Sequence, residues 1–495
     1  MNYRKTLAVL TALAACASVT AMPAGVQNND NTSIFAVKAA EEAAKLEEGS
    51  LGDKVGFVIY DNGEMVITGS GAITKTTEDI KNRESVTSVV FKDDVSGGVT
   101  EISEAAFSGM VNLKAVTLPE SLKTIGNIAF AGCRKLSDIT IPETAESIGA
   151  QTFAYTALKQ LTVPDSVKNL GEKAFEGCAG LEKAQIGRGI KQAVPGLFMD
   201  CKGLTELTIP DFETEEADYG EYGEGPKVAV KDMFNVIDPV TTECSVSKIT
   251  ILDGTEVISP YEFSCMSSLK EVVIPDTVTV ISKSAFSLCR SLEKITLPEG
   301  LKTIGSAAFA GCAGLSDIML PAGVETIDRY TFISCEKLSE ISLPEGTSAI
   351  DSQAFAHCYG LTDIYIPASV KKIDEKVFEE DRLKDIWFGG SEAEWKAAAG
   401  EYAGSEDLKK VTLHFDSVSL KYTKEEAEKL RGCGDVDANG KADITDLTLI
   451  SLYNIGDRDF SKAELIFADL DKDGKVTLAD LATLRMALSH KITLD

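Results

Sequence analysis

The sequence is poor in the residues and motifs that most often carry catalysis. Its 495 residues include three histidines, His357, His414 and His490, and neither a G-x-S-x-G nor an H-E-x-x-H motif occurs. The first motif places a serine nucleophile on a sharp turn, and the second places two zinc-binding histidines on one face of a helix. Without them, the sequence favours a protein that is not an enzyme.

Basic residues and long hydrophobic runs are also scarce. Lysine and arginine number 49 against 77 acidic residues, which gives a formal net charge of -28. Such a charge repels the phosphates of nucleic acids and the head groups of anionic lipids. Beyond the N-terminal region, no stretch reaches the roughly 18 apolar residues that span a bilayer. We therefore expect neither nucleic-acid binding nor a transmembrane segment.

The N-terminus carries the features of an export signal. Arg4 and Lys5 precede an apolar run over residues 7–17, and small residues follow at 19–21. This order predicts a signal peptide over residues 1–21 and a secreted protein. The stretch Leu13-Ala14-Ala15-Cys16 resembles a lipobox instead, which would place a lipid anchor on Cys16. Both alternatives remain open.

Internal repetition is what the sequence has in abundance. Phenylalanines recur nearly always 23 residues apart, at Phe107, Phe130, Phe153, Phe175, Phe198, Phe263, Phe286, Phe309, Phe332, Phe355 and Phe378. Between them the pattern L-x-x-I-x-I-P returns, in which alternating apolar residues predict a short strand that proline ends. A single 23-residue coil cannot bury its apolar side, but stacked coils can. The period predicts a solenoid with a parallel β-sheet of short strands and an irregular or short-helical convex side.

Cysteine follows the same period. Seven of the 11 cysteines lie three residues after a repeat phenylalanine, namely Cys133, Cys178, Cys201, Cys289, Cys312, Cys335 and Cys358. Other repeats place Met110, Thr156 or Asp381 in this slot. Because the slot accepts unrelated side chains, we expect buried free thiols rather than disulfides.

The repeat I-P-x-x-V-x-x-I-G-x-x-A-F-x-G-C resembles the BspA-like leucine-rich repeats, a family of bacterial surface proteins. The resemblance implies an N-terminal cap segment over residues 34–102, and repeats with a C-terminal cap over residues 103–415. The register breaks once, at an insertion over about 211–246 that is rich in acidic residues. This insertion is either solvated chain or a recognition loop.

The composition changes after a predicted linker over residues 416–432. Two twelve-residue loops follow, with oxygen-bearing residues at the spacing that calcium requires. At positions 1, 3, 5, 7, 9 and 12 the first loop has Asp435, Asp437, Asn439, Lys441, Asp443 and Asp446, and the second has Asp469, Asp471, Asp473, Lys475, Thr477 and Asp480. Position 7 would bind through its backbone carbonyl and position 9 through a water molecule. The loops predict two calcium ions.

The two loops depart from the general EF-hand pattern in two ways, and these departures indicate which kind of calcium-binding domain they belong to. Both loops end in aspartate rather than glutamate, and Gly432-Cys433-Gly434 leaves no room for a helix before the first loop. A duplicated unit of loop and following helix resembles the type I dockerins, which implies a small all-α calcium-binding domain over residues 433–495.

The dockerin resemblance also implies a partner, the cohesin domain of a scaffoldin in a cellulosome-type assembly. In that family the contacts come chiefly from loop positions 10 and 11 and helix positions 17 and 18. Here these are Ile444, Thr445, Ser451 and Leu452 in the first half, and Leu478, Ala479, Arg485 and Met486 in the second. Because the two halves differ, we predict a single binding orientation.

Together these features predict a secreted, non-catalytic binding or structural protein that a calcium-dependent dockerin attaches to a cohesin. The repeats would present a surface to plant cell-wall polysaccharide, to another surface protein or to a host protein. One alternative is a lipid-anchored surface adhesin. Another is a polysaccharide-degrading enzyme, which would need two carboxylates held about 5 to 10 Å apart.

Overall fold

The computed structural model describes residues 43–92, 97–212, 216–218, 224–226, 228–235, 244–420, 422–423, 427, 429–437, 441–456, 460 and 462–489. The predicted signal peptide, Cys16, Asn439 and His490 lie outside these residues. None of the helices in the described ranges combines the length and the apolar composition needed to cross a membrane.

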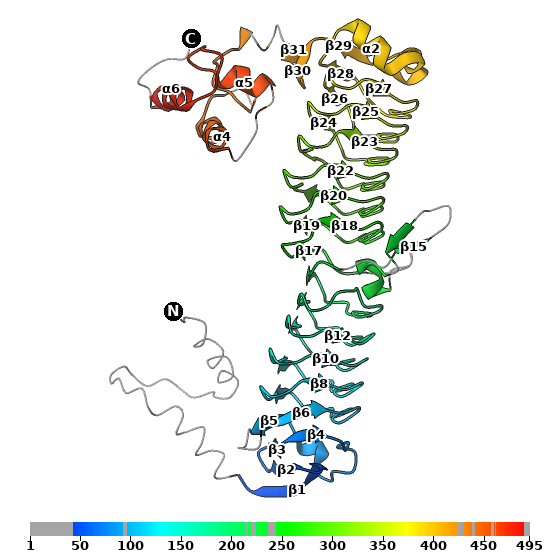
Figure 1. Ribbon diagram of the computed structural model, residues 1–495, viewed down its shortest axis with the longest axis vertical. Coiled ribbons are helices and arrows are strands. Elements are labelled where there is room, and N and C mark those ends of the chain that lie inside the picture. Colours follow the sequence, from blue (N-terminus) through cyan, green and yellow to red (C-terminus); the bar gives the residue numbers. More distant parts are fainter. Residues whose placement is uncertain are drawn as a thin grey trace.

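The main body is a long stack of coils, with the chain entering at one end and a small helical module at the other (Figure 1). Two antiparallel hairpin pairings close the N-terminal end, where β1 (Lys45–Gly52) pairs with β2 (Val55–Tyr60) and β2 with β3 (Glu64–Gly69). From β3 onward the pairing is parallel, beginning with β5 (Ser88–Lys92). Because each coil pairs only with its neighbours, the sequence period sets the architecture.

The L-x-x-I-x-I-P segments and their variants form the expected parallel strands, one in most coils, and the C-terminal end of the stack adds a last one. In chain order these are β7 (Ala115–Thr117), β9 (Asp138–Thr140), β11 (Gln160–Thr162), β13 (Lys183–Gln185), β14 (Glu206–Ile209), β17 (Lys248–Ile251), β19 (Glu271–Val273), β21 (Lys294–Ile295), β24 (Glu340–Ser342), β26 (Asp363–Ile366), β28 (Asp385–Phe388) and β29 (Thr412–His414). The parallel solenoid predicted from the sequence is confirmed.

A second set of short parallel strands runs along another side of the stack, in three separate sheets. Its members are β4 (Gly71–Ile73), β6 (Val99–Ile102), β8 (Thr124–Ile125), β10 (Ser147–Ile148), β12 (Asn169–Leu170), β18 (Val257–Ile258), β20 (Val280–Ile281), β22 (Thr303–Ile304), β23 (Thr326–Ile327), β25 (Ala349–Ile350) and β27 (Lys372–Ile373). The remaining turns include the 3-10 helices η1 (Arg83–Ser85) and η3 (Val230–Phe234). The predicted insertion contains the hairpin of β15 (Glu216–Asp218) and β16 (Glu224–Pro226).

The repeat phenylalanines stack in the core in two runs, one from Phe107 to Phe198 and one from Phe263 to Phe378. Phe107 and Phe130 lie 5.2 Å apart between ring centroids with an interplanar angle of 6°, and Phe309 and Phe332 lie 5.6 Å apart at 3°. This spacing is close to the roughly 4.8 Å between paired strands, so the sheet ladder brings the rings into contact. One phenylalanine per coil therefore both marks the period and fills the core.

Each coil also contains sharp turns in the left-handed backbone region. One such position is occupied by Ala105, Ile128 and Gln151 in successive coils, with φ values of 57°, 47° and 52°. A β-branched residue is strained in this region because its side chain crowds the backbone. Ile128 is therefore a local weak point in the stack.

The cysteines form a second buried column beside the rings. The ten described cysteines are free, and the seven repeat cysteines are buried. Each repeat thiol donates a hydrogen bond to the carbonyl oxygen of the phenylalanine of the preceding coil, as Cys335 Sγ does to Phe309 (3.3 Å) and Cys358 Sγ to Phe332 (3.1 Å). The expected buried free thiols are confirmed for these seven residues.

The C-terminal end of the stack is covered by α2 (Glu392–Ala399), η4 (Gly400–Gly404) and η5 (Glu406–Leu408). A short hairpin of β30 (Ser417–Ser419) and β31 (Tyr422–Thr423) follows. It leads to a small module whose described helices include α4 (Ile444–Ile455), α5 (Lys462–Ala468) and α6 (Leu478–Leu488). The fold is thus a repeat solenoid with a small all-α C-terminal domain, as the sequence predicts.

Candidate functional site

Two clusters of aspartates lie in the loops that precede α4 and α6. Carboxylate oxygens of Asp435, Asp437 and Asp446 all lie within 4.8 Å of one another, and so do those of Asp469, Asp471 and Asp473. The two clusters take their members from positions 1, 3, 5 and 12 of the predicted loops. Folding of twelve contiguous residues is enough to bring these oxygens together.

The residue at position 12 is fixed by the start of the helix that follows each loop. Asp446 lies in the first turn of α4 and accepts the backbone N–H of Asp443 at 2.8 Å, while the side chain of Asp443 accepts the N–H of Thr445 at 2.7 Å. Thr477 and Asp480 form the same reciprocal pair at the start of α6. This is a capping box, which satisfies backbone donors that the helix leaves unpaired.

The same carboxylates also close the loops onto themselves. Asp446 Oδ1 accepts the N–H groups of Val436 at 2.7 Å and Asp437 at 3.1 Å. Asp480 Oδ1 accepts those of Leu470 and Asp471 at 2.8 and 3.2 Å. Position 12 of each loop is therefore held by the backbone of positions 2 and 3.

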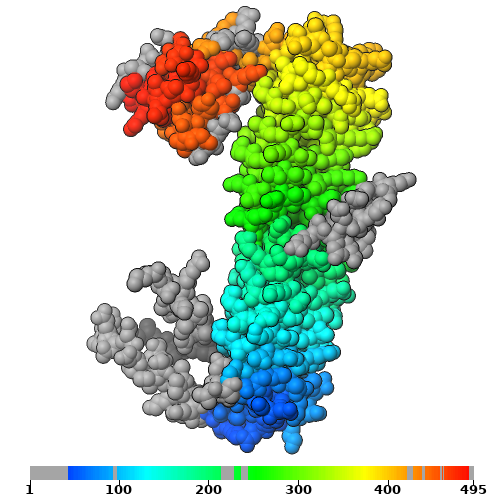
Figure 2. Space-filling model, viewed as in Figure 1, coloured from blue at the N-terminus to red at the C-terminus, as the bar shows by residue number. Residues whose placement is uncertain are grey.

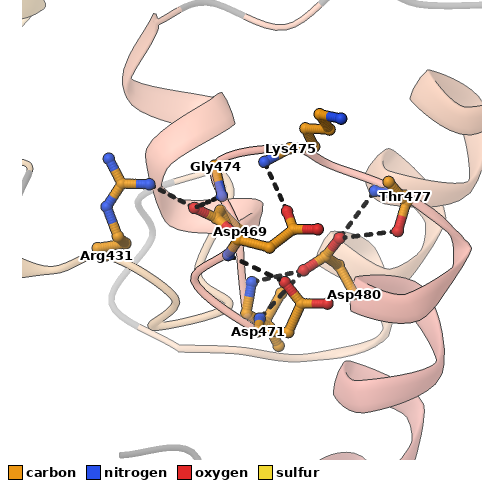
Figure 3. A network of polar contacts seen from close by, with 9 residues as sticks. Arg431, Asp469, Asp471, Gly474, Lys475, Thr477 and Asp480 are labelled. Atoms are coloured by element: carbon orange, nitrogen blue, oxygen red, sulfur yellow. Dashed lines mark hydrogen bonds and ion pairs between the residues drawn. The ribbon is translucent and has the colours of Figure 1, made fainter.

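The second loop contains a buried carboxylate oxygen that a bound cation would stabilise. Asp469 is almost fully buried. Its Oδ2 accepts the N–H of Gly474 at 3.1 Å and contacts the guanidinium of Arg431 (Figure 3). Its Oδ1 is buried and has no hydrogen-bond partner among the residues that the structure describes. A buried carboxylate oxygen without a donor is unfavourable unless a cation binds it. The residues of this loop therefore fit a hard ion such as calcium.

The pKa values of two aspartates also favour a bound cation. Burial raises the pKa of Asp446. Desolvation raises the pKa of Asp471, and the neighbouring charges of Asp480, Asp473 and Asp469 add to this effect. Both shifts mean that the ionised clusters are unfavourable on their own, and a divalent ion would relieve that repulsion.

The structure places the other predicted ligands at the loops in different ways. The N–H of Lys475 donates to Asp473 Oδ1 at 2.8 Å, and its side chain points away from the carboxylates (Figure 3). Asp443 and Thr477 serve as helix caps, a role that the short patterns D-I-T-D and T-L-A-D signal in the sequence. Asn439 lies outside the described residues. Arg431 was not foreseen, because no local pattern links it to a loop 38 residues later.

The residues predicted to contact cohesin lie on α4 and α6. Ile444 and Leu478, the two residues at position 10, are 68% and 69% exposed, and Met486 is 42% exposed. The helices pack instead through Ile450 and Leu484, which are buried in a small core of their own. The other members of the predicted set are exposed or partly exposed: Thr445, Ser451, Leu452, Ala479 and Arg485. Large apolar side chains left in solvent at equivalent positions are typical of a protein interface.

Comparison with known proteins identifies both parts of the chain. The family "BspA type Leucine rich repeat region (6 copies)" matches residues 81–218 and 256–384, and the "Dockerin type I domain" matches residues 433–489. A search of the curated proteins found no match.

Similar solved structures include three leucine-rich repeat proteins of bacteria. One from Bacteroides ovatus is 22% identical, with 74% of this chain and 98% of that chain covered and a TM-score of 0.44. One from Eubacterium ventriosum is 20% identical, with 68% and 95% covered and a TM-score of 0.33. A leucine-rich cell surface protein from Faecalibacterium prausnitzii is 22% identical, with 72% and 97% covered and a TM-score of 0.26.

The repeat matches cover more than half of the sequence and coincide with the stacked coils, and the dockerin match coincides with the two acidic loops and their helices. The chain belongs to the family of proteins with BspA type leucine-rich repeats, and it ends in a type I dockerin domain.

Proposed function

We propose that this protein is a secreted, non-catalytic component that binds two calcium ions through its dockerin and thereby attaches to a cohesin domain of a scaffold. A type I dockerin supports cohesin binding, and BspA-like repeats together with a dockerin are typical of extracellular bacterial proteins. The observation that carries the proposal is the buried, unpartnered Oδ1 of Asp469 in the described part of a loop whose other members are also carboxylates.

Calcium would act on the dockerin by neutralising the two acidic clusters and fixing the start of α4 and α6. The proposed ligands are the aspartates at positions 1, 3 and 12 of each loop, Asp473, and the backbone carbonyls of Lys441 and Lys475. Because metal binding is then part of folding, removal of calcium should unfold the dockerin and leave the solenoid intact.

Titration calorimetry of the full chain tests the calcium assignment. We expect two calcium ions per chain for the wild type, and one ion for either Asp446→Ala or Asp480→Ala, since each substitution opens one loop. Asp138→Ala is the matched control, because it removes the same charge from an exposed strand position in the solenoid. Two ions bound by both loop variants would contradict the assignment.

A panel of cohesins tests the partner. We expect one or more cohesins to bind the chain in calcium and to be released by chelator. Leu452→Asp and Arg485→Asp should weaken the binding unequally, because the two halves of the dockerin present different side chains and we propose a single orientation. Equal losses for both variants would argue for two interchangeable orientations.

The solenoid is proposed to present a surface to a protein or to a cell-wall polysaccharide. Support comes from the domain content, since neither matched module is a catalytic type. The division into a cap over 34–102, repeats over 103–415, a linker over 416–432 and a dockerin over 433–495 stays a prediction. A hydrolysis screen on plant cell-wall polysaccharides tests the non-catalytic assignment, and turnover of any substrate would contradict it.

A further inference from the structure

The junction between the solenoid and the dockerin contains a chain of packed side chains. The sequence predicts a linker at residues 416–432, yet described residues of this stretch contact both bodies. In the space-filling view, the dockerin lies against the C-terminal end of the stack (Figure 2). We propose that β30 and α5 form a specific intramolecular interface, which holds the dockerin in a set orientation on the solenoid.

Strand β30 lies between the two bodies. On one side it packs against β28, a strand of the solenoid, and on the other against α5 of the dockerin. Ser417 is buried, and its hydroxyl donates to the backbone carbonyl of His414 at 3.2 Å. Val418, the next residue, is also buried. Since neighbouring residues of a strand point to opposite sides, one strand can bind both bodies.

A small hydrophobic cluster joins β30 to α5. Val418 packs there with Ala427, Ala463 and Phe467, all of them buried, and Phe467 is only 2% exposed. The cluster is separate from the solenoid core and from the core of the dockerin helices. Phenylalanine carries a large apolar surface, so its burial outside both cores gives the junction a driving force of its own.

An ion pair connects the two bodies a second time. Lys462, the first residue of α5, lies 2.9 Å from Glu345 in the solenoid, between Nζ and Oε2. The other carboxylate oxygen of Glu345 accepts the hydroxyl of Tyr365 at 2.7 Å. Tyr365 is buried on β26. The hydrogen bond from Tyr365 therefore positions Glu345 independently of Lys462.

The side chains of the solenoid next to β30 are held by contacts with one another. Trp387 on β28 stacks on His414, with ring centroids 3.8 Å apart and an interplanar angle of 6°. Each ring is held by a carboxylate: Trp387 Nε1 donates to Asp363 Oδ1 at 3.4 Å, and His414 Nε2 lies 2.8 Å from Asp385 Oδ1. A preorganised platform of this kind loses little freedom when a second body binds.

The contact is limited in extent. A cavity of about 840 Å³ remains at the junction, lined by Asp416, Arg431, Lys462, Ile466 and Val476 among others. The contacts that join the two bodies run through β30, α5 and the Glu345–Lys462 pair, so disruption of these contacts should separate the bodies. The exposed Ile444 and Leu478 lie on α4 and α6 and not on α5, so the interface leaves the proposed cohesin-binding face accessible.

Carbodiimide cross-linking of the full chain tests the ion pair directly, because this reagent joins a lysine and a carboxylate that are in contact. We expect a peptide that joins Lys462 to Glu345 in the monomer fraction. Lys183–Glu206 at 2.8 Å and Lys248–Glu271 at 2.7 Å are internal controls of similar exposure within the solenoid. Cross-links at both controls without one at Lys462–Glu345 would overturn the proposal.

A second test separates the two bodies. Val418→Asp should raise the radius of gyration in small-angle scattering and shift the tryptophan emission to the red, because Trp387 lies on the strand beneath β30. Val273→Asp, an exposed strand position far from the junction, is the matched control and should change neither value. Calcium uptake reports separately that the dockerin is folded, so this result does not depend on whether a cohesin binds.

If Val418→Asp fails to fold, an exchange of charges between Lys462 and Glu345 tests the interface instead. Lys462→Glu should expand the chain in scattering, and the double variant Lys462→Glu with Glu345→Lys should restore the compact form. The interface would be refuted by a wild-type chain whose radius of gyration already exceeds that of the docked structure and is unchanged in both variants, since no docked state would then exist to lose.

Discussion

Replacement of Asp381 should stabilise the last coils of the solenoid at alkaline pH. Asp381 occupies the slot that holds a thiol in most other coils, and the carbonyl at the equivalent place is that of Phe355. Both carboxylate oxygens are buried and make no well-aligned hydrogen bond within the described chain, although the backbone of Cys358 lies close enough to favour the ionised form. Burial, reinforced by the charge of Asp407, raises the pKa of Asp381 to about 8.

The sign of the effect follows from this raised pKa. An aspartate in an unfolded chain has a pKa near 4, so the folded state binds the proton more tightly. The stability that comes from the protonated form is complete below about pH 4 and is lost as the pH rises through 8. A tenfold difference in proton affinity between the two states corresponds to about 1.4 kcal/mol. Because water entering the coil reduces the effect, we expect a loss of about 2 to 4 kcal/mol between pH 5 and pH 9.

Two substitutions isolate this contribution. Asp381→Asn removes the charge at nearly constant shape, and Asp381→Cys restores the thiol that donates to a phenylalanine carbonyl in the other coils. The assay is urea denaturation at pH 5, 7 and 9, followed by the fluorescence of Trp387 and Trp395, which are both buried near the last coils. Burial also raises the pKa of Glu262 to about 8. Because Glu262 is present in all three proteins, its contribution to the pH dependence of stability is the same in each and cancels in the comparison. An equal pH dependence for wild type and Asp381→Asn would refute the reasoning.

Two further predictions concern the coils. Ile128→Asn should raise the free energy of unfolding by about 0.5 to 1 kcal/mol, because asparagine tolerates the φ of 47° better than a β-branched residue. Urea denaturation measures this, and a marked loss of stability would show that packing of the isoleucine outweighs its strain. Iodoacetamide at pH 8 should label the partly exposed Cys265 in the folded chain, while Cys312 and Cys335, whose pKa values burial raises, should react only in denaturant. Peptide mass analysis reads out both, and native labelling of the two buried thiols would contradict the structure.

The sequence alone determined the solenoid and the two acidic loops, because both are local. A coil contacts only its neighbours, so a 23-residue period with one phenylalanine and one cysteine per turn predicts the stacking, the ring column and the buried thiols. The carboxylates of each acidic loop come from twelve contiguous residues, so their spacing predicts that they converge. Helix caps such as Thr477 can also be predicted from a short local pattern of residues.

Only the tertiary structure decided which distant groups meet. The strands of the second set, most of which have two residues, are too short to be recognised in a sequence, since their pairing depends on how each coil turns. Arg431 meets Asp469, and Lys462 meets Glu345, across gaps in the sequence that no periodicity spans. Such contacts depend on how one folded body lies against another, which is set by shape and charge over whole surfaces rather than by any short pattern of residues.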